Sequence, residues 1–356
     1  MQIALDLRWR IGPGGEPLDP RLFELLRAVA DTGSLQRAAR IVRLSYRHAW
    51  GLLQRWEGLL GQSLVTLERG RGARLTGVGE TLLWADRRVS ARLAPELESL
   101  ASALQGELSQ AIDAEQSPPL RIFASHDLAL GPLRDLLHEQ GHAHAELQFR
   151  GSLDSLRLLG SGRCELAGFH LPEGKLGRLL APRYRPWLSA RAHRLVHVAH
   201  RQQGIMLRRN DCKRIQRIAD LARRTVRFVN RQPGSGTRLL FDALLDACGL
   251  EPHEIRGYES EEFTHLAVAA MVASDAADAG FGIEAAAARF GLLFVPVVRE
   301  RYCLAARRET LSHPGVSAVL LTLLGPAFRE RVVELRGYDA ADAGTLLSVS
   351  DVLPGS

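Results

Sequence analysis

The chain has 356 residues, of which 46% are hydrophobic and 24% charged, a composition that excludes a disordered chain and allows two or three domains. No stretch approaches the roughly 20 consecutive apolar residues of a membrane-spanning helix. The start of the chain lacks the basic and apolar segments of a signal peptide, so we expect a cytoplasmic protein. The four cysteines are far apart and predict neither a disulfide framework nor a cysteine zinc site: Cys164, Cys212, Cys248 and Cys303.

One segment of the chain, whose overall net charge is +6, is locally basic, and its surroundings compensate it. Residues 21–74 contain ten arginines against four acidic residues, whereas residues 1–116 as a whole carry 15 basic and 14 acidic groups. Such a local excess is typical of a surface that binds phosphate groups, although a solvated arginine face has the same composition.

Three helical patterns follow one another in this segment. The first ends at Gly33, and Ser34 and Ser45 occupy the positions of N-caps for the second and third. Two short helices joined by a tight turn form a helix-turn-helix, whose second helix enters the major groove of DNA. The apolar positions expected on the buried faces are Leu22, Leu25, Leu26, Val29, Leu35, Ala38, Ala39, Val42, Ala49, Leu52, Leu53, Trp56 and Leu60.

The opposite face of the third helix carries groups that contact nucleic acids. Tyr46, Arg47, Trp50 and Gln54 point away from the apolar stripe and can reach base edges or phosphates. The following "LVTLERGRGARLT" predicts a strand, a turn and a strand with Arg69, Arg71 and Arg74, which is a basic wing. The alternative is a helical core with solvated arginines.

Residues 32–83 resemble the winged helix-turn-helix of LysR-type regulators. The resemblance is strongest to the molybdate-responsive branch, through "LSYRHAW" in the third helix and "RGRGA" followed by "LT" in the wing. It implies a DNA-binding domain over residues 1–77. It also implies that DNA is faced by Ser34, Ser45, Tyr46, Arg47 and His48, and that the flanking backbone is contacted by Arg71 and Arg74.

Residues 78–114 predict one long helix with a kink or a new turn at Pro95. Its apolar positions recur at steps of three and four, as a helix that packs against a partner requires: Val89, Leu93, Leu97, Leu100, Leu104, Leu108 and Ile112. The alternative is a helix packed on its own domain. The LysR-type resemblance implies a linker helix through which a homodimer or a tetramer forms.

The remaining residues, 115–356, begin with the linker "EQSPPL" and alternate strands with amphipathic helices. This alternation predicts an α/β architecture with mostly parallel sheets, in which ligands bind beyond the carboxyl ends of strands. The strand candidates are "LRIFAS", "AELQFR", "CELAGFH", "TVRFVN", "DAGFGI" and "LLFVPVV".

Several junctions between a strand and the next helix carry hydroxyl groups. Helix N-termini offer unpaired N–H groups, and hydroxyls add neutral donors, so converging junctions make an anion-binding cage. Arg238 falls in the first turn of a helix after "PGSG", where a guanidinium can reach an oxyanion. Besides Arg238, the predicted effector-binding residues of these junctions are Ser125, His126, Ser152, Ser235, Gly236, Thr237 and Thr264.

Other uses of these motifs are less well supported. The "PGSGTR" turn lacks the lysine of a P-loop and the third glycine of a dinucleotide fingerprint. The stretch "HEQGH", His138 to His142, matches a zinc protease pattern, but Gly141 predicts that the helix ends there. We therefore expect no metal, no cofactor and no catalytic residue. An enzyme of molybdenum-cofactor or hydrolytic chemistry that uses the α/β domain remains the weaker hypothesis.

Residues 120–340 also resemble the periplasmic-binding-protein-like domain, through "GSGTR" and "ADAGFG" in particular. The resemblance implies two α/β lobes joined by crossing strands, with Tyr302 near the ligand. Together the two resemblances imply a transcription factor that senses molybdate or tungstate. Formate or another small carboxylate remains an alternative effector, since molybdate receptors of this fold seldom use arginine and the small sensing domains of the molybdate-responsive regulators are missing here. A DNA-binding protein whose α/β domain is only a scaffold is a third possibility.

Overall fold

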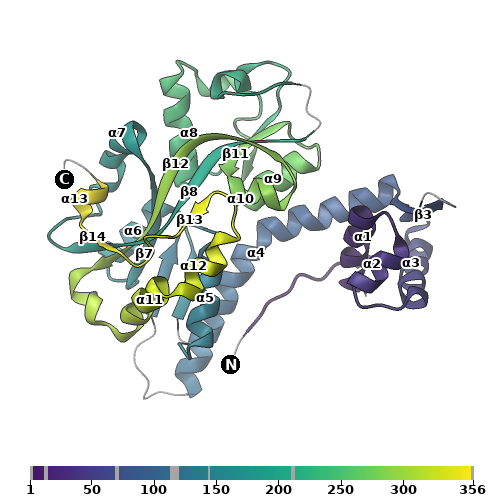
Figure 1. Cartoon of the computed structure of the whole chain (residues 1–356), viewed down its shortest axis with the longest axis horizontal. Helices are drawn as coiled ribbons and strands as arrows, with labels where there is room; N and C mark the ends of the chain where they lie inside the picture. Colours follow the sequence, from purple (N-terminus) through teal and green to yellow (C-terminus); the bar gives the residue numbers. More distant parts are fainter. Residues whose placement is uncertain are drawn as a thin grey trace. The chain divides into compact units, whose positions relative to one another are not determined.

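The computed structural model describes residues 3–11, 15–68, 72–112, 120–142, 145–209 and 213–353 (Figure 1). The chain divides into two compact units, one of Asp6–Ser90 and one of Ala91–Ser356 with Met1–Leu5. Several features of the sequence analysis lie outside the described residues: Arg69, Arg71, Cys212 and the linker residues 115–119.

The smaller unit is built from three helices and two short antiparallel hairpins. Gly33 ends the first helix in the left-handed conformation, with φ of 63°, and the hydroxyls of Ser34 and Ser45 cap the next two helices as predicted. The elements are β1 (Arg10–Ile11), β2 (Glu16–Pro17), α1 (Arg21–Thr32), α2 (Leu35–Ile41), α3 (Tyr46–Leu60), β3 (Val65–Glu68) and β4 (Gly72–Leu75).

The core of the smaller unit lies between the three helices. Leu22, Leu25, Leu26 and Trp56 are each no more than 1% exposed, and the other predicted apolar positions join the same cluster. Val42 and Leu60 are only partly buried, because they lie at the ends of α2 and α3. The predicted three-helix core is therefore confirmed.

The hairpin of β3 and β4 is held against the turn between α1 and α2. The Ala73 amide donates a hydrogen bond to the Gly33 carbonyl oxygen at 2.8 Å. Gly72 has a φ of 91°, and a Cβ at this position would lie 2.2 Å from the same oxygen. Only glycine allows this close approach, so the turn fixes the position of Arg74 on β4.

Helix α4 (Gly77–Ile112) is continuous through Pro95 and belongs to both units. In the larger unit its Ser99 and Ser102 hydroxyls accept hydrogen bonds from the Phe149 and Leu147 amides at 2.9 and 2.8 Å. These amides belong to an edge strand, so the serines satisfy donors that have no neighbouring strand. Neither α4 nor any other helix in the described residues has the length and apolarity that crossing a bilayer requires.

The larger unit contains one mixed sheet in the order β10-β9-β11-β8-β12-β7-β5-β6, and β13 and β14 also pair with β8. The parallel pairs are β5 with β6 and β7, and β9 with β10 and β11, whereas β8 and β12 run antiparallel to their neighbours. The strands are β5 (Leu120–Ala124), β6 (Ala145–Phe149), β7 (Leu166–Pro172), β8 (His193–Leu207), β9 (Phe228–Arg231), β10 (Glu261–Glu262), β11 (Ala279–Ile283), β12 (Leu293–Arg307), β13 (Tyr338–Asp339) and β14 (Leu346–Leu347).

The long strands β8 and β12 join two groups of strands, which we call the first half (β5, β6 and β7) and the second half (β9, β10 and β11). The expected α/β fold with crossing strands is confirmed. The expectation of a mostly parallel sheet is wrong. Strands β8 and β12 lie in the middle of the sheet, and every pair that includes one of them is antiparallel.

Helices cover both faces of the sheet. In the first half, α6 and α7 pack on one face and α5, α11 and α12 on the other, where α11 and α12 contact α5 (Figure 1). In the second half, α8 packs on one face and α9 and α10 on the other. The helices are α5 (Leu130–Glu139), α6 (Ser152–Gly160), α7 (Gly174–Tyr184), α8 (Gly236–Ala247), α9 (His265–Ala273), α10 (Glu284–Arg289), α11 (Pro314–Leu324), α12 (Pro326–Val333) and α13 (Val349–Val352), with single 3-10 turns at Ile218–Ala222, Pro252–Glu254 and Arg308–Ser312.

We expect Leu25→Ala to destabilise the smaller unit by about 2–5 kcal/mol, because it leaves a cavity among α1, α2 and α3. Chemical denaturation followed by circular dichroism measures the change. Leu59→Ala is the matched control, since Leu59 is 50% exposed and its loss should cost less than about 0.5 kcal/mol. Equal effects of the two substitutions would contradict the assigned core.

Candidate functional site

Helix α3 presents its polar face at the surface of the smaller unit. The Ser45 hydroxyl accepts a hydrogen bond from the His48 amide at 3.1 Å and so caps the helix. The side chains of Tyr46, Arg47 and His48 in the first turn are exposed. Arg74 is exposed on β4, and Ser34 caps α2 by accepting from the Arg37 amide. The predicted DNA-facing residues that the structure describes therefore lie on α2, α3 and β4.

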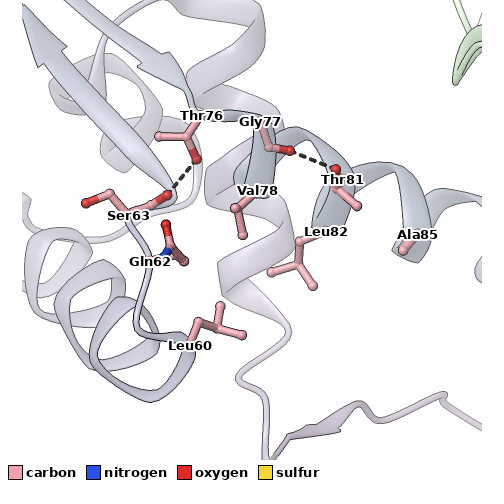
Figure 2. Close-up of a pocket in the computed structure, with 9 residues that line it drawn as sticks. All are labelled: Leu60, Gln62, Ser63, Thr76, Gly77, Val78, Thr81, Leu82 and Ala85. Carbon is pink, nitrogen blue, oxygen red and sulfur yellow. Dashed lines mark hydrogen bonds between the residues drawn. The ribbon is translucent and has the colours of Figure 1, made fainter.

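A pocket of about 620 Å³ lies beside the end of α3 (Figure 2). Its walls come from the turn after α3 and from the first part of α4, with Leu60, Val78 and Leu82 as apolar side chains. The Thr76 hydroxyl donates to the Ser63 carbonyl oxygen at 2.6 Å, so this hydroxyl is already engaged. The pocket offers no charged group and contains none of the predicted site residues.

The larger unit contains a group of buried polar atoms that have no hydrogen-bond partner within the described part of the chain. We call this group the polar centre. Its members come from the first half, the crossing strands and the second half: Ser125 Oγ, His126 Nδ1, Ser152 Oγ, Gln203 Oε1, Arg231 Nη1 and His265 Nδ1. Because buried polar atoms are nearly always hydrogen-bonded, such a group indicates a site for a ligand or for ordered water.

Members of the polar centre interact across the two halves. Burial lowers the pKa of His126 to about 3, and the charges of Arg231 and Arg201 act in the same direction. Burial and both arginines also lower the pKa of His265 well below its usual value. A Cβ at Gly151, just before α6, would lie 3.1 Å from the Gly234 oxygen of the "PGSGT" turn. These contacts and charges bring together the four predicted junctions, the fourth through His265, which follows Thr264.

Arg231 is the charged member of the polar centre. The residue is 5% exposed, with Nε donating to the Gln232 Oε1 atom at 3.2 Å and Nη2 to the Phe263 carbonyl oxygen at 2.9 Å. Among the described residues it has no ion pair with a carboxylate, and Nη1 has no partner. Burial, together with Arg201, lowers the pKa of Arg231 to about 9, so the guanidinium stays protonated at neutral pH.

The second buried arginine, Arg201, forms ion pairs with two carboxylates. Its guanidinium lies between Asp127, at 2.5 Å, and Glu300, at 2.9 Å. Glu300 also accepts from Gln203 and pairs with His170. Although burial opposes ionisation, His170 and Arg201 lower the pKa of Glu300 to about 2. This network holds β8 and β12 together, whereas the buried Arg231 has no carboxylate partner in the part of the chain that the structure describes.

The hydroxyls of three predicted residues are used within the protein. The Ser235 hydroxyl caps α8 and donates to the Gln232 carbonyl oxygen, and Thr237 accepts from Gln203 at 3.2 Å. The Tyr302 hydroxyl donates to the Ser125 carbonyl oxygen at 2.8 Å, so Tyr302 positions the strand that carries Ser125. A Cβ at Gly236 would lie 2.6 Å from the His170 ring, which shows how closely the α8 N-terminus approaches the network.

The Arg238 side chain is directed to other partners. Its Nε and Nη1 atoms donate to Asp242 and Glu261 at 3.2 and 3.0 Å, and its guanidinium stacks 3.9 Å above the Tyr258 ring. The Asp242 spacing of four residues along the helix is a sequence signal for this pairing.

Thr264 also has both functions of its hydroxyl engaged. It accepts from the Ala267 amide and donates to the Ala91 carbonyl oxygen of α4 at 2.9 Å.

Three members of the polar centre are not predicted from the sequence: Arg231, Gln203 and His265. Nothing in the sequence distinguishes a buried side-chain atom without a hydrogen-bond partner from one that has a partner.

The "HEQGH" stretch does not form the zinc-binding helix of its pattern. Helix α5 ends at Glu139, and Gly141 adopts a φ of 86° before His142. Glu139 pairs with Arg331 at 2.7 Å. Two histidines of that pattern must share one helix face, which this helix end prevents. Among the described residues, no cluster of three metal-ligating side chains occurs.

Family models match both parts of the chain. Residues 134–324 match the PBP superfamily domain, and residues 20–80 match the bacterial regulatory helix-turn-helix protein, lysR family. The uncharacterized protein YvgK of Bacillus subtilis is 28% identical over 251 residues, which cover 67% of this chain and 81% of that protein.

Two further relatives carry names that refer to molybdenum. The molybdenum-pterin-binding protein MopB of Rhodobacter capsulatus is 33% identical, covering 42% of this chain and 63% of that protein. The molybdenum transport protein ModE of Herbaspirillum seropedicae is 39% identical, covering 21% of this chain and 29% of that protein.

A solved structure of OxyR from Corynebacterium glutamicum is 16% identical and covers 89% of this chain and 94% of that chain, with a TM-score of 0.43. This last value is too low to support an argument.

One matched region lies within each unit of the structure. A LysR-type helix-turn-helix indicates a regulator rather than an enzyme, and the second region is an effector-binding domain. The chain belongs to the PBP superfamily and is a DNA-binding transcriptional regulator with a LysR-type helix-turn-helix.

Proposed function

We propose that this regulator senses a small anion that binds at the polar centre of its effector domain, in the cytoplasm, as a homodimer or a tetramer. The observation that carries the proposal is the buried Arg231 guanidinium, whose Nη1 atom has no partner among the described residues. A buried charge is costly unless it is paired, and an anion supplies the missing partner.

The neutral members of the polar centre complete the proposed site. The Ser125 and Ser152 hydroxyls, the N-terminus of α8 at Gly236 and Thr237, and the rings of His126 and His265 offer donors around Arg231. Neutral donors and helix N-termini bind small oxyanions without adding charge. Because their polar groups are engaged elsewhere, we assign structural roles to Ser235, Arg238 and Tyr302, and we leave Thr264 out of the anion ligands.

Molybdate or tungstate is the favoured effector. The support comes from the two relatives named for molybdenum and from a donor set with one guanidinium and several neutral groups. Formate or another small carboxylate is the alternative, since one guanidinium also binds a carboxylate in a bidentate manner.

The first turn of α3 is the proposed base-reading element. Tyr46, Arg47 and His48 are exposed there, with Ser34 and Ser45 at the caps of α2 and α3. We propose that Arg74, and Arg71 beside it in the sequence, contact the flanking phosphates. Two such heads in a homodimer engage two half-sites, which raises the affinity of a short recognition helix.

The exposed stripe of α4 is the proposed dimer interface. Leu100, Leu104, Leu108 and Ile112 are 51%, 42%, 44% and 68% exposed, on a helix whose Ser99 and Ser102 face the sheet. A run of exposed leucines at helical spacing is typical of a surface that packs against a second helix.

For the anion site, we expect Arg231→Gln to weaken binding of the effector by about 10- to 100-fold, the effect of removing a charged hydrogen-bond donor. Thermal shift with molybdate, tungstate, sulfate, phosphate, formate and other small carboxylates identifies the effector, and calorimetry gives the affinity. Arg256→Gln, at an exposed position, is the control. Arg238→Gln should lower the stability of the protein and leave its affinity for the effector unchanged. If Arg238→Gln weakens effector binding and Arg231→Gln does not, the anion-binding arginine is Arg238.

For DNA binding, we expect Arg47→Ala to weaken operator affinity by about tenfold or more and to reduce its salt dependence. The reason is that the substitution removes one cationic side chain that contacts the DNA. Fluorescence anisotropy on a duplex selected from genomic DNA by the wild-type protein measures both quantities. Arg55→Ala is the control on the same helix, since Arg55 pairs with Glu16. Equal losses for both variants would exclude the assigned recognition turn.

For assembly, we expect the pair Leu104→Glu and Leu108→Glu to dissociate the oligomer, because it places four carboxylates in a two-fold interface. Analytical ultracentrifugation measures the mass. Leu179→Glu, at a leucine of α7 that is 60% exposed, should leave the mass unchanged. An unchanged mass of the double variant would exclude this stripe as the interface.

A further inference from the structure

The proline inside α4 leaves one backbone carbonyl of the helix without its usual partner. In an α-helix the carbonyl of Ala91 accepts from the amide of residue 95, and proline has no amide hydrogen. The Thr264 hydroxyl, from the N-cap of α9 in the second half, donates to this oxygen at 2.9 Å. The donor that proline removes is thus replaced by a side chain of the effector domain.

The first half of the larger unit contacts the same turn from another side. The Ser99 hydroxyl donates to the Pro95 carbonyl oxygen at 2.8 Å and accepts from the Phe149 amide of β6 at 2.9 Å. Glu98 of α4 also pairs with Arg134 of α5 at 3.1 Å. The turn of α4 around Pro95 is therefore bonded to both halves at once.

Both contacts begin next to members of the polar centre. Thr264 precedes His265, whose Nδ1 atom is buried without a partner in the described structure. Phe149 packs against the His126 ring, with the ring centroids 4.9 Å apart. The two groups that hold the α4 turn are therefore each adjacent to a histidine of the polar centre.

Packing around Ala91 supports a close fit at this position. Ala91 is buried in a small cluster with Ala267 and Ala270 of α9. Arg92 lies over the Phe263 ring at 5.5 Å, so the next residue of α4 also contacts the segment before α9. Small side chains allow α4 and α9 to approach closely enough for the hydroxyl contact.

We infer that Thr264 is a positioning residue that sets the bend of α4 at Pro95 and transmits the state of the effector domain to the DNA-binding unit. The two halves hold α4 on either side of Pro95, so a change in their separation changes the helix at the position where it is weakest. The role of the anion in this inference rests on the proposed function. The contact itself does not.

The test compares full-length wild type with Thr264→Val, Thr264→Ser and Pro95→Ala. For each protein, anisotropy gives the DNA affinity with and without sodium molybdate, or whichever anion of the panel binds the wild type. Calorimetry gives the affinity for that anion. We expect the anion to change wild-type DNA affinity by about fivefold or more.

Thr264→Val should bind the anion as the wild type does and should lose most of the DNA response, whereas Thr264→Ser keeps it. Pro95→Ala restores an amide for the Ala91 carbonyl and should also reduce the response, without any change in the effector domain. Thr310→Val is the control, because the Thr310 hydroxyl donates to the Arg307 carbonyl oxygen, away from α4. A full response in Thr264→Val, or a wild type that binds the anion without any change in DNA affinity, would overturn the inference.

Hydrogen exchange of the amides of residues 92–99 provides a readout without any ligand. We expect Thr264→Val to speed this exchange by about tenfold and Pro95→Ala to remove that effect in the double variant. If no anion binds the wild type, the proposed effector function fails while this exchange still decides the inference. Unchanged exchange in Thr264→Val would overturn it. If that variant does not fold, Thr264→Ala, which also lacks the hydroxyl, replaces it in both measurements.

Discussion

One buried guanidinium, that of Arg231, forms no ion pair among the described residues, and the proposed function rests on it. Arg201 and Arg231 are both buried near the crossing strands, but Arg201 has Asp127 and Glu300 as partners and Arg231 has no carboxylate among the described residues. Moving a guanidinium out of water costs roughly several kcal/mol unless an opposite charge lies beside the guanidinium. Because Arg231 is held in this state, we propose that the fold is adapted to an anion that binds reversibly, as a sensor requires.

The topology explains why the charge is placed where two groups of strands meet. Strands β8 and β12 cross between the halves and carry Arg201, Gln203 and Glu300, while Arg231 ends β9 and the helices α6, α8 and α9 begin nearby. The ion pairs of Arg201 with Asp127 and Glu300 stabilise the crossing and do not depend on a ligand. The groups around Arg231 come from both halves, and we propose that an anion bound there contacts both and biases their separation. Helix α4 is bonded to both halves and continues into the DNA-binding unit, which provides a covalent route for that bias.

The sequence predicts the architecture better than the site. The three helices of the smaller unit and their caps follow from apolar spacing and from Ser34 and Ser45, because these signals are local. The strand-to-helix junctions were also found, since hydroxyls and glycines mark them. Which side chains remain free was not predictable: Arg231 and Arg238 are seven residues apart, and only the pairing of Arg238 with Asp242 and Glu261 separates their roles. Thr264 was assigned to the anion for the same reason, since its bond to Ala91 spans 173 residues of sequence.

The central claim is that a small anion binds beside Arg231, and crystallography of the protein with tungstate tests it most directly. The anomalous signal of tungsten locates the anion independently of any functional assay. The account predicts a peak within hydrogen-bonding distance of Arg231 Nη1, with the Ser125 and Ser152 hydroxyls around it. An ordered structure in which no anion lies beside Arg231, or in which tungstate binds only to exposed arginines, would contradict it.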